Sequence, residues 1–172
     1  LAGEGSVLVT EISSFQLEDI DTFRPQGAAL LNLTPDHLDR HHDLASYREA
    51  KMRIFENQSS DQHAVLGEQN DIAEEVGRRF RSRLLRFRLA DRGEEGAFIR
   101  DGRLGLRLGG KQTLLCPAGD LSLPGPHNQA NALAALAIVA PLGLPPDGLV
   151  ASLTSFAGLP HRLERVATVE SV

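Results

Sequence analysis

Acidic, histidine and lysine side chains stand where short apolar runs end or where a helix is expected. Glu11 directly follows the apolar run 7–10, the turn 34–42 carries two acids and three histidines, and Lys51 lies in a segment with helical spacing. A carboxylate is a hard oxygen ligand of the kind that Mg²⁺ prefers, and the ion takes only one or two from protein when it bridges phosphates. The pattern predicts a metal–phosphate site with Glu11 as a metal ligand, although an ordinary strand-end acid is the alternative.

The three histidines lie within Asp36-His37-Leu38-Asp39-Arg40-His41-His42. His37 is the best candidate for the site, because it comes just after a strand-like run ends. We expect His41 and His42 to face solvent. A small zinc hydrolase built on 36–42 is an alternative, but this stretch has no cysteine ligand and no His-Glu-x-x-His helix.

Lys51 is one of two lysines, against sixteen arginines. Lysine can lose its proton and arginine cannot. A neutral lysine amine can attack CO₂ and become a carbamate, which would give a metal an extra anionic oxygen ligand. The residues alone favour a lysine on the surface of a helix, so both interpretations stay open.

Asn128 and Asn131 open a helix after Pro124-Gly125-Pro126. Residues three apart share one helix face, and a carboxamide carries both a donor and an acceptor, which match an adenine edge. Capping of the helix is an equal alternative. Arg162 follows Gly158-Leu159-Pro160 and is suited to binding phosphate, or it belongs to a solvated linker.

The elements that position these residues have an α/β order. Continuous apolar runs at 7–10, 28–33 and 64–67 predict strands of a parallel sheet that is covered on both faces. Helices or strands are further predicted at 42–57, 70–80, 84–89, 127–142, 147–155 and 163–169. Ligands of such sheets bind beyond the carboxyl ends of the strands, where Glu11 and His37 fall.

The segment 97–123 has a different pattern. Short alternating runs are separated by Asp101-Gly102 and Gly109-Gly110. These dipeptides are typical of tight hairpin turns, so the segment predicts a small antiparallel meander. Such an insert usually forms an edge or a flap and not a catalytic floor.

Composition narrows the class of protein. The 172 residues suffice for one domain with a core, and the net charge of −5 argues against nucleic-acid and membrane-surface partners. The single cysteine, Cys116, is expected to be half-buried in a strand and fits a reducing cytoplasm. The sequence lacks an initiator Met and any apolar run near the roughly 18 residues of a membrane span, and we expect it to be a piece of a longer protein.

Five segments, in order, resemble the Mur ligases, the ATP-dependent amide-forming enzymes of bacterial peptidoglycan synthesis. The segments are Glu11-Ile-Ser-Ser-Phe-Gln-Leu-Glu18, 31–40, 47–55, 125–135 and 156–164. Phe15-Gln16-Leu17 after the two serines resembles the branch of the family that adds D-glutamate, because the branch that adds diaminopimelate or lysine typically has histidine there.

The resemblance implies metal roles and a reaction. Glu11 would bind Mg²⁺ between the ATP phosphates, and His37 with a carbamylated Lys51 would hold or position a second Mg²⁺. ATP would phosphorylate the terminal carboxylate of UDP-N-acetylmuramoyl-L-alanine, and the amine of D-glutamate would then displace phosphate from the acyl phosphate.

The resemblance also implies ligand contacts. Ser13 and Gln16 would touch the UDP-muramoyl substrate. Asn128 and Asn131 would lie near the adenine of ATP, and Arg162 would reach the nucleotide from a hinge.

The implied fold is like that of P-loop NTPases. Residues 1–158 would be a truncated central ATPase domain, and 159–172 a hinge with the first strand of a further domain. The sequence contains no Gly-rich phosphate loop ending in Gly-Lys-Ser/Thr. We therefore expect ligase activity to belong to the longer protein, and the isolated chain to lack it and to bind Mg-ATP weakly.

Two alternatives remain at this level. One is another member of the superfamily, such as a different Mur ligase or a folylpolyglutamate synthetase. The other is a naturally truncated module that has a structural or interaction role and no catalysis.

Overall fold

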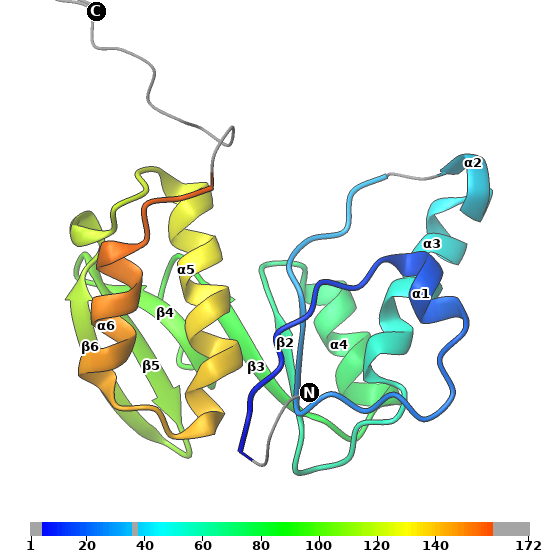
Figure 1. Ribbon diagram of the computed structural model, residues 1–172, viewed down its shortest axis with the longest axis horizontal. Coiled ribbons are helices and arrows are strands. Elements are labelled where there is room, and N and C mark those ends of the chain that lie inside the picture. The colour runs from blue at the N-terminus through cyan, green and yellow to red at the C-terminus, as the bar shows by residue number, and fades with distance from the viewer. Residues whose placement is uncertain (1–4, 36–37, 160–172) are drawn as a thin grey trace, which may run out of the picture.

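A six-stranded sheet forms the centre of the fold, and helices pack on both of its faces (Figure 1). The computed structural model describes residues 5–35 and 38–159. The strands lie side by side in sequence order: β1 Gly27–Leu30, β2 His63–Leu66, β3 Arg83–Arg88, β4 Gly96–Arg100, β5 Arg103–Leu108 and β6 Lys111–Pro117. Strands β1 to β4 are parallel, and β5 and β6 continue the sheet in antiparallel fashion. The expected α/β class, with a mostly parallel sheet and a small meander, is confirmed.

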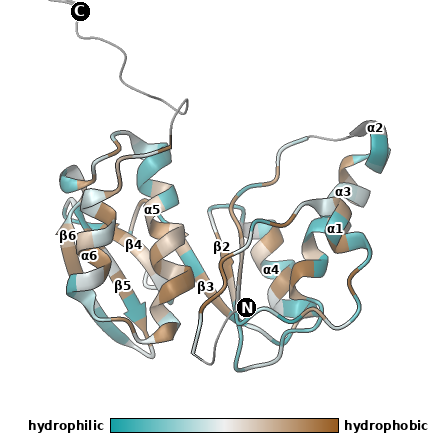
Figure 2. Cartoon of the chain, viewed as in Figure 1, coloured by the Kyte–Doolittle hydropathy of each residue, from teal (hydrophilic) through white to brown (hydrophobic). Residues whose placement is uncertain are grey.

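The helices form one layer on each face of the sheet. They are α1 Ser14–Glu18, α2 Leu38–His41, α3 Leu44–Met52, α4 Asn70–Arg79, α5 Pro126–Val139 and α6 Pro146–Ser155, with short 3₁₀ turns η1 Arg53–Phe55, η2 Ala118–Asp120 and η3 Ala140–Leu142. Successive side chains of a strand point to opposite faces. Ala64 and Leu66 accordingly pack with α3 and α4, whereas Val65 packs with α5 and α6. Figure 2 shows hydrophobic residues concentrated in the strands and in α5.

The meander forms one edge of the same sheet. Asp101 and Gly102 have φ angles of 50° and 70°, and Gly109 and Gly110 have 58° and 75°. Positive φ at both central residues matches the right-handed twist of a two-residue hairpin, so these dipeptides set the two turns. Cys116 on β6 is buried, and burial raises the pKa of its thiol, so the cysteine is a packing residue.

One predicted strand is wrong. Residues 7–10 do not form a strand, and Val7, Leu8 and Val9 are 66%, 79% and 85% exposed. An apolar β-branched run indicates a demand for burial, but a strand also needs a neighbour that supplies backbone hydrogen bonds. Within the described residues, β1 pairs with β2 alone and leaves its other edge open. The predicted strand 163–169 lies outside the described residues.

The remaining predicted elements are present with shifted ends. The run 28–33 gives β1, which ends at Leu30, and the helix predicted over 42–57 is α3 followed by η1. Asp43 caps α3 by accepting from the Ser46 backbone N–H at 2.7 Å. Within residues 5–35 and 38–159, no helix combines the length and the apolarity that crossing a membrane requires.

His63, at the start of β2, is a buried titratable group. Burial and the nearby positive charge of Arg83 lower the pKa of its imidazole below the usual 6.5. The unfolded chain therefore takes up a proton at this imidazole at a higher pH than the folded protein does. The stabilisation is fully present above pH 6.5 and is lost as the pH falls from there through the folded-state pKa.

Replacing His63 with leucine should remove this pH dependence. We expect the wild-type urea midpoint to fall between pH 7.5 and pH 5.5, and the midpoint of His63→Leu to fall less, because leucine takes up no proton in either the folded or the unfolded state. Urea titrations of the chain at the two pH values measure the difference. The exposed His127, replaced by glutamine, serves as the control and should behave as wild type. Equal pH dependence in His63→Leu and wild type would contradict the assignment.

Candidate functional site

Ser13 and Gln16 form a capping box at the start of α1. The Gln16 backbone N–H donates to Ser13 Oγ at 3.3 Å, and the Ser13 backbone N–H donates to Gln16 Oε1 at 2.9 Å. Such a box satisfies backbone donors that a helix start leaves without partners. Ser13 Oγ also lies 3.1 Å from Gln16 Oε1. Both side chains are exposed.

His41 is buried, and the expectation that it faces solvent is wrong. Its side chain is 3% exposed, and its ring lies between α1 and α3. His41 Nε2 lies 2.9 Å from Ser14 Oγ, and Nδ1 lies 3.4 Å from Glu18 Oε1. The local sequence shows three histidines in a polar turn, whereas the burial comes from α1, which begins 27 residues earlier. His42 is exposed, as expected.

Lys51 lies on the last turn of α3 and is half-buried. Its Nζ is 5.8 Å from the centroid of the Tyr47 ring, a cation–π contact one helical turn away. The amine is therefore held over an aromatic surface and is not a fully solvated side chain. Whether it carries a carbamate stays a prediction.

The predicted metal ligands are only partly within the described structure. Glu11 is exposed in the irregular segment before α1. His37 and Arg162 lie outside the described residues. In the segments that the structure describes, no three His, Cys, Asp or Glu side chains gather closely enough to hold a metal ion. The metal roles of Glu11, His37 and Lys51 remain predictions.

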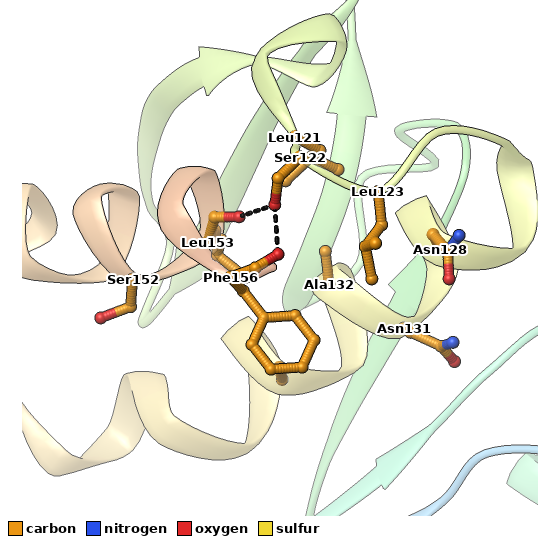
Figure 3. Close-up of a pocket in the computed structure, with 10 residues that line it drawn as sticks. Leu121, Ser122, Leu123, Asn128, Asn131, Ala132, Ser152, Leu153 and Phe156 are labelled. Carbon is orange, nitrogen blue, oxygen red and sulfur yellow. Dashed lines mark hydrogen bonds between the residues drawn. The ribbon is translucent and has the colours of Figure 1, made fainter. Parts of the chain in front are cut away.

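A pocket of about 330 Å³ lies between α5 and α6 (Figure 3). Its walls are largely apolar, with Leu121, Leu123, Leu153 and Phe156 among the lining residues. The Ser122 hydroxyl closes one wall by donating to the Phe156 carbonyl, as Figure 3 shows. An apolar cavity of this size with few polar groups is typical of small-molecule binding sites.

Asn128 and Asn131 supply amide groups to this pocket. Figure 3 shows both amides on the same side of α5, one turn apart. Asn128 Nδ2 donates to the Pro124 carbonyl at 2.8 Å, while the helix cap itself is Gly125. Asn131 is exposed. Neither asparagine is the N-cap residue, so Asn128 braces the turn before α5 and Asn131 can present its amide to a ligand.

The structure places the candidate groups on both faces of the sheet. The segment after β1 and the start of α5 lie at the same end of the molecule (Figure 1). Helix α3, with Lys51, packs on one face of the sheet, and α5, with the two asparagines, packs on the other. A ligand that reaches both groups must therefore extend from one face of the sheet to the other, and α/β sheets bind ligands beyond the carboxyl ends of their parallel strands.

Two features of the site are missed by sequence reasoning. One is the contact of the buried Ser14 and His41 with the partly exposed Glu18, and the other is the aromatic wall that Phe156 gives the pocket. Ser14 and Glu18 are four residues apart and thus share a face of α1, which is a usable signal. The partner of that face, His41, carries no comparable signal in its own segment.

The comparisons with known proteins agree on one family. A model described as the Mur ligase middle domain matches residues 2–139. The chain is 41% identical over 170 residues to the UDP-N-acetylmuramoylalanine–D-glutamate ligase of Pelotomaculum thermopropionicum, which covers 99% of this chain and 37% of the relative. It is 40% identical over 172 residues to the ligase of the same name from Koribacter versatilis, which covers 100% of this chain and 38% of the relative. The chain thus spans a little over a third of the length of these curated relatives.

Solved structures share the fold at lower identity. MurF from Acinetobacter baumannii superposes with a TM-score of 0.62 at 20% identity, over 85% of this chain and 32% of that protein. A murein peptide ligase from Psychrobacter arcticus superposes with a TM-score of 0.62 at 21% identity, over 84% of this chain and 30% of that protein. Folylpolyglutamate synthetase from L. casei superposes with a TM-score of 0.56 at 18% identity, over 84% of this chain and 37% of that protein. These likenesses show a common fold.

Proposed function

The chain belongs to the Mur ligase family, and on that premise we propose that it is part of the ligase that joins D-glutamate to UDP-N-acetylmuramoyl-L-alanine. The observation that carries the proposal is the 41% identity over 170 residues to a ligase of that name. Other superfamily members, such as MurF and folylpolyglutamate synthetase, share the fold at 18–20% identity. The difference in identity favours the D-glutamate enzyme over both.

The proposed reaction has two steps, which the full-length protein performs in the cytoplasm. The terminal carboxylate of UDP-N-acetylmuramoyl-L-alanine takes the γ-phosphoryl group of ATP, giving an acyl phosphate and ADP. The D-glutamate amine then attacks the acyl carbon, the new amide forms, and inorganic phosphate leaves. Such transfers depend on positioning and on neutralising phosphate charge, and there Mg²⁺ would act.

The pocket between α5 and α6 fits the adenine of ATP. Its apolar walls can cover the faces of a planar base, and its volume of about 330 Å³ exceeds what a purine needs. The exposed amide of Asn131 offers a donor and an acceptor to the base edge, while Asn128 holds the start of α5 in place. Arg162 would contribute to nucleotide binding from beyond the described residues.

The capping box of α1 fits the muramoyl substrate. The box uses Gln16 Oε1, so the Gln16 Nε2 group is left to donate. Ser13 Oγ accepts one backbone N–H and has a second lone pair. The exposed start of α1 can therefore accept and donate hydrogen bonds without losing its cap.

The proposed metal ligands are Glu11, His37 and a carbamylated Lys51. Glu11 presents an exposed carboxylate, an oxygen ligand that suits Mg²⁺, in the irregular segment before α1. Lys51 lies over the ring of Tyr47, one turn earlier on the same helix, α3. A carbamate on Lys51 would turn this cation into an anionic oxygen donor.

The reaction assay tests the function directly. We expect the full-length protein, given ATP, Mg²⁺ and UDP-N-acetylmuramoyl-L-alanine, to release phosphate when D-glutamate is added. L-Glutamate, diaminopimelate and the D-alanine dipeptide should give no release above background, because the amine acceptor is specific. Release with one of those amines instead of D-glutamate would reject the proposal. Phosphate and the amide product are measured together.

Lys51→Arg should lower kcat at least about tenfold, because arginine keeps the positive charge but cannot form a carbamate. The measurement is steady-state phosphate release by the full-length protein. Lys111, the other lysine of this chain, lies on β6 at the far edge of the sheet. Lys111→Arg is therefore the matched control and should keep wild-type kinetics. Wild-type kcat in Lys51→Arg would remove the carbamate from the mechanism.

Filling the pocket should weaken ATP binding alone. Ala135 lines the pocket from an exposed position on α5, so leucine there occupies the cavity without disturbing the core. We expect Ala135→Leu to raise the KM for ATP about tenfold, equivalent to about 1.4 kcal/mol, with the KM for D-glutamate unchanged. Ala151→Leu, on the exposed side of α6, is the control. An unchanged KM for ATP would place the adenine elsewhere.

A further inference from the structure

The side chain of His41 joins two helices that carry proposed site residues. From α1 it meets Ser14 Oγ at 2.9 Å and Glu18 Oε1 at 3.4 Å. A carboxylate only accepts hydrogen bonds, so the tautomer protonated at Nδ1 is the one that suits Glu18. In that tautomer Nε2 accepts the Ser14 O–H. Both ring nitrogens are directed at α1.

The faces of the His41 ring extend the junction to α3. The ring stacks on Phe15 with centroids 5.4 Å apart and an interplanar angle of 13°, and it lies 5.3 Å from the Tyr47 ring. Tyr47 is buried. The same Tyr47 ring also contacts Lys51, whose Nζ lies 5.8 Å from the ring centroid. A continuous set of contacts thus runs from α1 through His41 and Tyr47 to Lys51.

Helix α1 needs such external support. It has five residues, fewer than an isolated helix needs to persist in water. Its buried side chains are Ser14 and Leu17, at 2% and 1% exposure. Ser14 is the neighbour of Ser13, so the hydrogen bond to His41 fixes the end of the helix that presents Ser13 and Gln16.

The arrangement of Ser14, His41 and Glu18 has the order of a nucleophile, a base and an orienting acid. Ser14 is too buried to attack a substrate. An acyl-transfer role at this serine is therefore rejected, and the arrangement acts through the helices it joins.

We propose that His41 is a positioning residue of the amide-forming reaction, which ties the substrate-binding start of α1 to the lysine helix α3. This inference rests on the proposed function, since it assigns Ser13 and Lys51 to one substrate. With the tie intact, the two helices hold the muramoyl end of the substrate and Lys51 at a fixed separation. Without the His41 contacts, the side chains of Ser13 and Lys51 are still present but are no longer aligned with each other.

The test compares variants of the full-length protein. His41→Phe keeps the ring contacts with Phe15 and Tyr47 but loses both polar contacts. We expect its kcat/KM for UDP-N-acetylmuramoyl-L-alanine to fall at least about tenfold, because small misplacements of reacting groups are costly. Its KM for ATP should stay unchanged, because the proposed adenine pocket lies on the opposite face of the sheet. His41→Gln keeps a polar group for Ser14 and should recover most of the loss.

The controls separate positioning from folding. His42→Asn alters the exposed neighbour, whose φ of 65° asparagine tolerates, and should keep wild-type kinetics. If His41→Phe does not fold, Ser14→Ala removes the partner of Nε2 and should lower kcat/KM for the same substrate. Active-site titration corrects each rate for the folded fraction.

The outcomes for the inference and for the function differ. Unchanged kcat/KM per folded molecule in both His41→Phe and Ser14→Ala would overturn the inference while wild-type activity upholds the function. An equal fall in kcat/KM for ATP and for the muramoyl substrate would also overturn the inference, since it would indicate that the whole site is perturbed. If the wild type makes no amide with D-glutamate, the function fails. Calorimetric binding of UDP-N-acetylmuramoyl-L-alanine then decides the inference, and weaker binding by His41→Phe than by wild type upholds it.

Discussion

The close packing of α5 across the sheet is the interaction on which the rest of the structure depends. Its buried face is built mainly from small residues, Ala132, Ala134 and Ala137, with Leu133 and Leu136 filling the deeper positions. Small side chains allow a helix axis to approach a sheet closely, and protein interiors at this density leave little freedom for shift. The position of α5 fixes the place of Asn128 and Asn131 and one wall of the pocket. Helix α6 completes that wall because it packs beside β6, the outermost strand of the meander.

The other face of the sheet is organised by polar contacts as well as apolar ones. Side-chain ion pairs join α3 to α4. Arg48 pairs with Asp71 and Glu75, and Arg79 pairs with Glu49 and Glu75. Each surface pair contributes little, but the shared carboxylate makes them a network. Beneath it, Phe55 and Met52 are fully buried. The helix that carries Lys51 is thus held by its neighbour in the fold, while α1 is held by His41.

The sequence predicts the parts of the fold that local chemistry decides. The paired turn residues at 101–102 and 109–110 specify the meander, and Pro126 with Gly143 marks the limits of α5 and its final turn. The parallel strands β1 and β2 follow from the apolar runs 28–33 and 64–67. Of the candidate site, Asn128 and Asn131 are found together by their helical spacing.

Prediction from the sequence fails where contacts with a distant segment determine the local structure. The run 7–10 has the composition of a strand but no pairing partner within the described residues, so its pattern is misleading. His41 looks solvated until α1 is placed against it. Phe156 belongs to no motif and enters the pocket only because α6 returns beside α5. In each case the missing information is a tertiary contact, which no window of neighbouring residues contains.

The open edge of β1 has a consequence for handling the molecule. Three exposed apolar residues, Val7, Leu8 and Val9, are displayed by a chain whose sheet has unsatisfied backbone groups along one side in the described structure. Edges of this kind are templates for pairing between molecules. We expect this edge and these exposed residues to favour association between molecules at high concentration. A charged side chain introduced among them should oppose that association without any change in the core.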